Sequence, residues 1–454
     1  MAVANENWSG RLGFILATVG SAVGLGSIWK FPYEVGANGG GGFVLFYLAG
    51  LVLIVTPLML AEFTIGRRGK SDARASIAAV ARAHGASPQW ALAGTLGVVT
   101  AFLILSFYSV IGGWALAYAV ETVWAGLPGT SAAAAQDHFN ALLASPERMT
   151  AYHTCFMLIT AIIVARGIAG GIEEASKILM PALVILMVAL AAYSMIEGDI
   201  ATTLRYLFTF NPEKMTVRVA LEALGLGFFS IGVGLAVMIT YAAYAGPEIN
   251  LREAAFIAIA SDTAISFLAG FIVFPIIFAN KLDPSSGPGL IFVTLPLAFS
   301  AMPMGVLFAV SFFVLLFIAA IASAISMLQM PVAFAQQTLG WSRKKSVAVA
   351  GIACWLTGLG SVFSFNLWAN WFPLAAIPIF KTATFFDLLD HLTSNLLLPA
   401  GGLALALFTG WALPKQILAE ELDLEPTALE MMWTALRYVV PFGIAAATIL
   451  PFLI

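Results

Sequence analysis

The stretch that decides the fold is Thr18-Val-Gly-Ser-Ala-Val-Gly-Leu-Gly-Ser-Ile-Trp-Lys-Phe-Pro32. It lies in an apolar run long enough to cross a membrane, yet Gly20, Gly24 and Gly26 interrupt the run at its centre. At membrane depth, unpaired backbone groups are tolerated only where protein or a water-filled cavity receives them. The interrupted span therefore predicts a binding site near the middle of the membrane.

A second stretch repeats this pattern about half-way along the chain. Residues 229–236 read Phe-Ser-Ile-Gly-Val-Gly-Leu-Ala, and Val-Gly-Leu occurs at both 23–25 and 233–235. A lone glycine in a membrane span is usually a packing notch, but a cluster of them that recurs in a second span favours a break. Paired glycine-interrupted spans are typical of secondary transporters built from inverted repeats.

Composition places the chain in the membrane. The 454 residues are 61% hydrophobic and 10% charged, with a mean hydropathy of +0.95, whereas soluble proteins carry roughly 25% charged residues. The net charge of -3 forms no basic stripe, which excludes a nucleic-acid partner. Cys155 and Cys354 both lie in apolar runs, so we expect buried, inert thiols and no disulfide framework.

Apolar stretches of about 20 residues, long enough to span a bilayer, follow one another along the chain. We predict eleven spans, at 12–34, 42–66, 90–124, 149–166, 174–196, 217–244, 254–279, 304–338, 346–363, 385–412 and 433–453. The fold class is therefore an all-α polytopic membrane protein. We expect three parts: a first repeat over residues 1–200, a second over 201–415, and a cytoplasmic loop with span eleven over 416–454.

Basic residues in two short loops give the orientation. The loop after span two and the loop after span eight hold Arg67, Arg68, Lys70, Arg74, Arg82, Arg343, Lys344 and Lys345. By the positive-inside rule both loops are cytoplasmic. We therefore expect a multi-pass protein of the inner (plasma) membrane, with its N-terminus in the cytoplasm and its C-terminus outside.

The first two spans resemble those of the neurotransmitter:sodium symporters, the family of the bacterial leucine transporter. The matching residues are Trp8, Arg11-Leu-Gly13, Gly20-Ser-Ala-Val-Gly-Leu-Gly26, Trp29-Lys-Phe-Pro32, Asn38-Gly-Gly-Gly-Gly-Phe43 and Glu62, extended by Gly112-Gly-Trp114, Ile239-Thr-Tyr-Ala-Ala-Tyr244 and Phe386-Asp387-Leu-Leu-Asp390. The resemblance implies the leucine-transporter fold, with two inverted five-helix repeats, broken helices 1 and 6, and one extra helix. It also implies sodium-coupled uptake of an amino acid or a related small molecule. The span count resembles an eleven-span bacterial subgroup.

The resemblance also implies a substrate pocket. Tyr108 has the spacing to Trp114 of the family tyrosine that holds the substrate carboxylate, although a core aromatic with a satisfied hydroxyl is the plainer interpretation. Monoamine-transporting relatives carry an Asp where this chain has Gly24, so the substrate should be a neutral hydrophobic or aromatic amino acid. The predicted pocket residues are Ser21, Ala22, Gly24, Leu25, Gly26, Ile104, Tyr108, Phe229, Ser230, Gly232, Leu235, Ser323 and Met327.

Oxygen ligands suit a hard cation such as Na⁺. By the same resemblance, one sodium site consists of Ala22, Ser27, Ser230 and Asp262. A second consists of Gly20, Val23, Ala319, Ala322 and Ser323. Because Ala322 offers no side-chain oxygen, we expect the second site to be weak, which leaves the number of coupled sodium ions at one or two.

Two gates are expected. On the outer side Lys30 can face Asp390, as a point charge where the family more often has arginine. On the inner side Trp8 and Tyr244 are retained, while Asn5 and Gln337 stand where the family has an Arg–Asp latch. The inner gate is therefore expected to be uncharged and easier to open.

Asp262 also affects whether uptake is expected to require chloride. Animal relatives need Cl⁻ near the first sodium site, and this chain keeps the associated serine as Ser266 but has Asp262 in place of an Asn. A mid-membrane acid needs a cation or a proton as partner, and the simpler possibility is a structural acid paired with a neighbour. We predict chloride-independent uptake, with Asp262 substituting for the anion and taking up a proton on the empty return step.

Other classes are less well supported. Glu62 is expected to be a structural charge that braces the broken helices. The four histidines are scattered, and no Ser-His-Asp or phosphate-loop motif occurs, so we predict no enzyme activity. A channel or a membrane receptor is the rival class, but a channel would show repeated filter segments, and no sizeable soluble domain is present for signalling.

Overall fold

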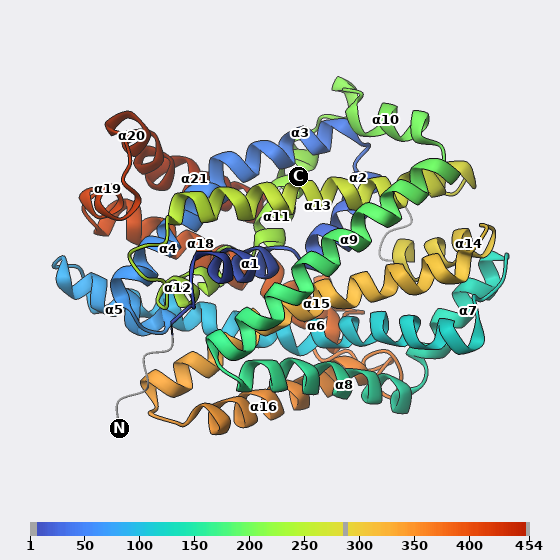
Figure 1. Ribbon diagram of the computed structural model, residues 1–454, viewed down its shortest axis with the longest axis horizontal. Coiled ribbons are helices and arrows are strands. Elements are labelled where there is room, and N and C mark those ends of the chain that lie inside the picture. Colours follow the sequence, from blue (N-terminus) through green and yellow to red (C-terminus); the bar gives the residue numbers. More distant parts are fainter. Residues whose placement is uncertain (1–6, 285–288, 451–454) are drawn as a thin grey trace.

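The computed structural model describes residues 7–284 and 289–450, and those residues form helices and connecting segments without strands. The helices run roughly along the long axis of the molecule (Figure 1). Short helices cap its two ends. α5 (Ala73–Ala83), α19 (Gln416–Leu422) and α20 (Pro426–Thr434) lie at one end, and α7 (Ala132–Leu143), α10 (Ile200–Phe208) and α14 (Leu295–Ser300) lie at the other.

The predicted spans all have helical counterparts. Nine stretches of the described chain are long and apolar enough to cross a membrane, and a pair bent by 48° makes a tenth. That pair is α1 (Arg11–Ala22) with the π-helical turn η1 (Gly26–Lys30) and α2 (Phe31–Ala37). The remaining span, predicted at 217–244, is divided between α11 (Val217–Ile231) and α12 (Val237–Ala242). The two predicted breaks are therefore present.

The other spans are continuous or contain only π-helical turns. Five spans are single α-helices: α6 (Ala91–Ala125), α8 (Pro146–Ala165), α13 (Leu251–Ala279), α15 (Gly305–Thr338) and α16 (Arg343–Phe363). Two contain one π-helical turn in the first half of the chain: α3 (Gly41–Gly50), η2 (Leu51–Val55) and α4 (Thr56–Gly69) form one, and η4 (Ile168–Glu173) and α9 (Glu174–Glu197) form the other. The last two are α17 (Phe385–Leu392), η8 (Thr393–Leu397), α18 (Leu398–Leu407) and η9 (Phe408–Ala412), followed by α20 (Pro426–Thr434), η10 (Ala435–Val439) and α21 (Val440–Ile449). The predicted all-α class is confirmed. The boundaries at 200 and 415 stay predictions.

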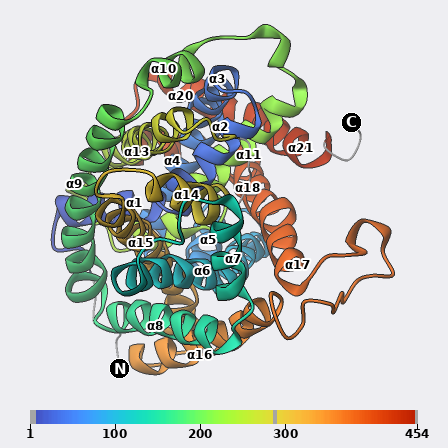
Figure 2. The ribbon, with the colours of Figure 1, turned by 90° about the vertical axis from the view of Figure 1, so that its right-hand side faces the viewer.

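The centre of the bundle is formed by helices that are apolar around most of their circumference. α6 and α15 make the most extensive helix contact in the described chain, α1 and α12 pack against α15, and α11 contacts α1 and packs mainly against α3. Helices with many exposed apolar side chains, such as α8, α9 and α16, surround this group. Figure 2 looks onto the end that carries α7, α10 and α14, and it shows the segment between α16 and α17 projecting from the body.

The cysteine prediction holds for one residue. Cys354 on α16 is buried, whereas Cys155 on α8 is exposed, so the predicted burial of Cys155 was wrong. The reason is that an apolar run shows that a helix crosses the membrane but not which of its faces is turned toward lipid.

Candidate functional site

The break in the first span leaves backbone groups that side chains from other helices contact. After Ala22 the chain leaves the helix at Val23, whose ψ is 111°. The N–H of Leu25 donates a hydrogen bond of 3.2 Å to the hydroxyl of Tyr108 on α6. The hydroxyl of Ser323 on α15 donates one of 3.2 Å to the carbonyl of Val23. A Cβ at Gly24 would collide with Ser323 Oγ, so the glycine allows this close approach.

The second break has a different cause. Gly232, Gly234 and Ala236 have φ values of 72°, 90° and 58°, in the left-handed region that residues other than glycine rarely adopt. The N–H of Gly234 donates a hydrogen bond of 2.7 Å to the carboxylate of Glu62, which is fully buried on α4. Glu62 thus braces the break, as predicted, because it accepts a bond from backbone that the helix leaves unpaired.

Between the two breaks lies a cavity of about 50 Å³, which we call the central cavity. Apart from Ala22, every residue predicted for the substrate pocket lines it, whereas Ala22 is buried and absent from the lining. The sequence analysis missed part of the lining, namely Ile231, Val237, Ser326 and Leu398. Ser326 lies one helical turn after Ser323 on α15, and this spacing could have identified it.

Next to the central cavity, hydroxyl groups surround one buried acid. The Oγ of Ser230 on α11 lies 2.9 Å from both carboxylate oxygens of Asp262 on α13. The hydroxyl of Ser27 donates to Oδ1, and that of Tyr47 on α3 donates to Oδ2 over 3.0 Å. Tyr47 also lies 3.4 Å from the hydroxyl of Ser266. The structure therefore brings together the three predicted side-chain ligands of the first sodium site.

Tyr47 is a further member of this group that the sequence analysis did not predict. It is fully buried, and its only signal was a hydroxyl within the apolar run 42–66. Every side-chain donor atom around Asp262 is an oxygen, which is the ligand type that a hard cation prefers. The group can therefore hold Na⁺, with carboxylate charge to balance it.

The second predicted sodium set is also close together, but it is poorer in oxygen. Val23 and Ser323 share the hydrogen bond described above, and a Cβ built on Gly20 would lie 3.5 Å from the Cβ of Ala322. Ala319 is buried on the same helix, one turn before Ser323. Ser323 is the one side-chain oxygen that this set offers.

On the side opposite the basic loops, a cavity of about 360 Å³, which we call the outer cavity, lies next to the central cavity, and Leu25, Tyr108 and Phe229 line both. Lys30 and Asp390 also line this outer cavity. The Lys30 ammonium lies 4.5 Å from the centroid of the Phe229 ring, and Asp390 accepts a hydrogen bond of 2.8 Å from Ser394. Within the described ranges, the two predicted gate residues share a cavity but not an ion pair.

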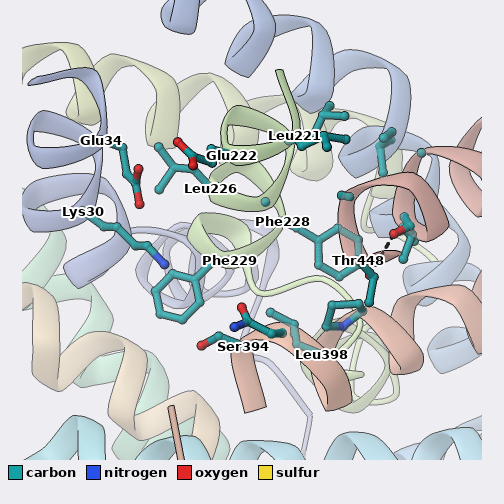
Figure 3. A pocket seen from close by; sticks show the side chains of 18 of the residues that line it. Lys30, Glu34, Leu221, Glu222, Leu226, Phe228, Phe229, Ser394, Leu398 and Thr448 are labelled. Atoms are coloured by element: carbon teal, nitrogen blue, oxygen red, sulfur yellow. Dashed lines mark hydrogen bonds between the residues drawn. The ribbon is translucent and has the colours of Figure 1, made fainter. Parts of the chain in front are cut away.

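A side cavity of about 380 Å³ adjoins the outer one, and the sequence analysis did not anticipate it. Figure 3 shows Lys30 directed at the Phe229 ring, with the carboxylates of Glu34 and Glu222 nearby on facing helices. Glu34 and Lys30 border both this cavity and the outer one. Phe229 is thus a residue that borders all three cavities.

On the side of the basic loops, which are predicted to be cytoplasmic, neutral hydrogen bonds link the expected inner-gate residues. The indole N–H of Trp8 donates to the carbonyl of Tyr241 over 2.9 Å, and its backbone N–H donates to the carbonyl of Tyr244 over 3.3 Å. Gln337 donates to the Tyr244 hydroxyl over 3.2 Å and accepts from the hydroxyl of Ser71 over 2.6 Å. Asn5 lies outside the described residues. Beyond this layer is an inner cavity of about 1010 Å³.

Comparisons with known proteins bear on the family and the fold. The model of the sodium:neurotransmitter symporter family matches residues 5–141 and 138–370. The chain is 35% identical over 441 residues to YhdH, an uncharacterized sodium-dependent transporter of Bacillus subtilis, with 96% of this chain and 95% of YhdH covered. It is 28% identical to the sodium-dependent neutral amino acid transporter B(0)AT2 of Bos taurus, over 60% of this chain and 41% of that protein.

A solved structure is similar over nearly the whole length. The crystal structure of MhsT in complex with L-phenylalanine superposes with a TM-score of 0.88 at 39% identity, and the match covers 97% of this chain and 98% of MhsT.

Proposed function

This chain belongs to the sodium:neurotransmitter symporter family, and we propose that it imports neutral hydrophobic or aromatic amino acids together with Na⁺ by alternating access. The observation that carries the proposal is the central cavity, which lies between two helix breaks and beside the buried carboxylate of Asp262. The similarity to MhsT, whose structure holds L-phenylalanine, supports an aromatic substrate.

The residues have complementary roles in this proposal. The N–H of Leu25 and the hydroxyl of Tyr108, now 3.2 Å apart, would turn to the substrate carboxylate, which the positive end of the broken helix also attracts. Ile104, Leu235 and Met327 would surround the apolar side chain. Gly24 leaves no acid to pair with an amine substrate that lacks a carboxylate.

For the coupling ion, we place Na⁺ at the group formed by Ala22, Ser27, Ser230 and Asp262. A second ion would bind at Gly20, Val23, Ala319, Ala322 and Ser323, more weakly because Ala322 supplies no oxygen. When bound, Na⁺ supplies positive charge, and this chain's residues position its carboxylate and hydroxyl groups to meet that charge.

Asp262 also supports chloride-independent uptake. A carboxylate already provides the negative charge that balances Na⁺, so an added anion is not needed. After Na⁺ and substrate leave, a proton on Asp262 would replace the cation, since a buried charge without a partner is costly. The return step would then export a proton.

The gates and the orientation complete the proposal. Lys30 and Asp390 would draw together over the outer cavity, while Trp8, Tyr244 and Gln337 open the inner layer. We place the N-terminus in the cytoplasm and the C-terminus outside, in the inner (plasma) membrane, because Arg67, Arg68 and Lys70 gather at one end of the bundle, and basic residues at the ends of spans favour the cytoplasmic side.

A thermal-shift screen tests the substrate and the ion together. We expect phenylalanine, tryptophan and leucine to raise the melting temperature of the purified protein in sodium buffer but not in potassium buffer. Stabilisation by amines without a carboxylate, or the same shifts in both buffers, would contradict the proposal.

A further inference from the structure

The start of the last span carries a group of cationic and aromatic side chains that has no role in the proposed transport site. We call Arg437 on η10 with Trp411, Trp433 and Tyr438 the Arg437 cluster. The guanidinium carbon of Arg437 lies 4.2 Å from the ring centroid of Trp411, 4.7 Å from that of Trp433 and 5.7 Å from that of Tyr438. Aromatic faces attract a cation, so the rings hold the guanidinium in place.

Two N–H donors of this cluster lack an acceptor in the part of the chain that the structure describes. The Nε of Arg437 and the indole nitrogen of Trp433 are both buried, and neither has a hydrogen-bond partner among the described residues. The indole of Trp411 does have one, because it donates to the carbonyl of Arg437 over 2.9 Å. Buried donors are normally paired, so a ligand with acceptor oxygens would complete the cluster.

The cluster also has excess positive charge. Lys415 lies 5.8 Å from the ring centroid of Trp433, and its ammonium forms an ion pair with Glu430. Within residues 7–284 and 289–450, no carboxylate forms an ion pair with Arg437. Glu430 thus neutralises Lys415 only, and the unbalanced charge of Arg437 attracts an anion.

The position of the cluster indicates where that anion comes from. Trp411 ends span ten, and Tyr438 lies in span eleven, with 55% and 54% of their surfaces exposed at the periphery of the bundle. Trp, Tyr and Arg side chains are enriched where a span meets the lipid headgroups. The connecting helix α19 is held to the end of α4 by an ion pair of 2.5 Å between Arg67 and Glu421, so the cluster faces the leaflet on the inner-cavity side.

We infer that the Arg437 cluster binds the phosphate of an anionic phospholipid headgroup. The guanidinium supplies charge and donors, the Trp433 indole supplies a further donor, and the exposed faces of Trp411 and Tyr438 contact the adjoining acyl chains. In the proposed orientation this is the cytoplasmic leaflet, where anionic lipids attract basic residues. η9 and η10 pack closely at Gly410, where a Cβ would lie 2.9 Å from the Cα of Arg437. A lipid bound at the cluster would therefore contact spans ten and eleven at their junction and hold them together.

The test measures lipid affinity of the purified full-length protein in detergent. Phosphatidylglycerol and phosphatidylcholine are titrated separately, and an apparent Kd is taken from the rise in melting temperature. We expect tighter binding of phosphatidylglycerol, and about fivefold weaker binding in Arg437→Gln, the effect of removing one basic residue near a membrane surface. The matched control is Arg82→Gln, which removes an exposed arginine of α5 at the same end and should leave the apparent Kd unchanged.

Each alternative has its own outcome. Equal loss in Arg437→Gln and Arg82→Gln, or equal affinity for the two lipids, would contradict a specific site. Stabilisation by inorganic phosphate alone would contradict a lipid source. If Arg437→Gln does not fold, Trp433→Phe replaces it as the test variant, because phenylalanine keeps an aromatic ring but lacks the indole N–H donor. Unchanged phosphatidylglycerol affinity in that variant would overturn the inference.

Discussion

The Oγ of Ser230 lies 2.9 Å from each carboxylate oxygen of Asp262, and this contact joins the second broken span to α13 at the middle of the membrane. Ser230 lies just before Gly232, the residue at which α11 ends in a left-handed conformation. Any change in the charge of Asp262 therefore acts directly on the helix break that lines the central cavity.

Chloride dependence is the first consequence of this arrangement. We expect uptake by the wild-type protein to be unchanged when gluconate replaces chloride. Asp262→Asn should lose most uptake in gluconate and regain part of it in chloride, because Tyr47, Ser230 and Ser266 then leave their hydroxyl groups for an anion. The measurement is labelled phenylalanine uptake into proteoliposomes in the two salts.

The variant Asp262→Asn also tests the proposed proton export. Wild-type exchange should depend on the internal pH, and Asp262→Asn should lose that dependence, since an amide does not bind a proton in this range. Tyr47→Phe is the control, because it removes a hydrogen bond from Asp262 but keeps the acid. A strong loss of wild-type uptake without chloride, or a full pH response in Asp262→Asn, would show that Asp262 does not have the proposed role.

The second sodium site can be strengthened. Ala322→Thr places a hydroxyl beside Gly20, since a Cβ added to that glycine would lie 3.5 Å from the Cβ of Ala322. We expect a lower half-saturating Na⁺ concentration for transport, because a missing oxygen ligand is supplied. Ala322→Val has the same shape without the oxygen and serves as the control. No gain in the threonine variant, or the same gain in both, would show that the ligand set is wrong.

We expect Gly232 to limit the size of the substrate that the central cavity accepts. Gly232→Ala should reduce tryptophan and phenylalanine uptake before alanine uptake, because the added methyl group enters the central cavity lining. The φ of 72° at this position adds a cost of about 1–2 kcal/mol for a residue with a Cβ. The melting temperature is therefore measured alongside uptake of the three amino acids. Equal loss for alanine and tryptophan would remove Gly232 from the pocket.

We expect Glu62 to stabilise the fold at the second helix break. Glu62→Ala leaves the buried N–H of Gly234 without its 2.7 Å acceptor, which should cost about 1–3 kcal/mol of stability. Glu62→Gln keeps a carbonyl oxygen and should lose less. Melting temperatures of the two variants give the comparison, and an alanine variant as stable as the glutamine variant would exclude the bracing role.

The broken helices could be predicted because glycine patterns act locally. The glycines at 20, 24 and 26 and at 232 and 234 mark the two breaks, and hydropathy predicts the spans. In the structure Gly20 remains inside α1 and Gly26 inside η1, so the first break is confined to residues 23–25. Tyr47 could not be identified as a partner of Asp262, because the two residues are 215 positions apart and only packing brings α3 to α13.

Other parts of the site depend on similar long-range contacts. Leu398 enters the central cavity from α18, where its apolar side chain looks like any lipid-facing leucine in the sequence. Lys30 was expected to face Asp390, and only the structure shows its ammonium over the ring of Phe229. Exposure is likewise a property of packing, which is why the burial of Cys155 was predicted wrongly.

Sodium-driven accumulation of phenylalanine tests the central claim most directly. Purified protein is reconstituted into liposomes, and the internal concentration of labelled phenylalanine is followed with an inward Na⁺ gradient and again after the gradient has been dissipated. We predict accumulation above the external concentration that collapses when the gradient is removed. Equilibration without accumulation, whether or not Na⁺ is present, would contradict the assignment of this chain's cavity and breaks to coupled transport.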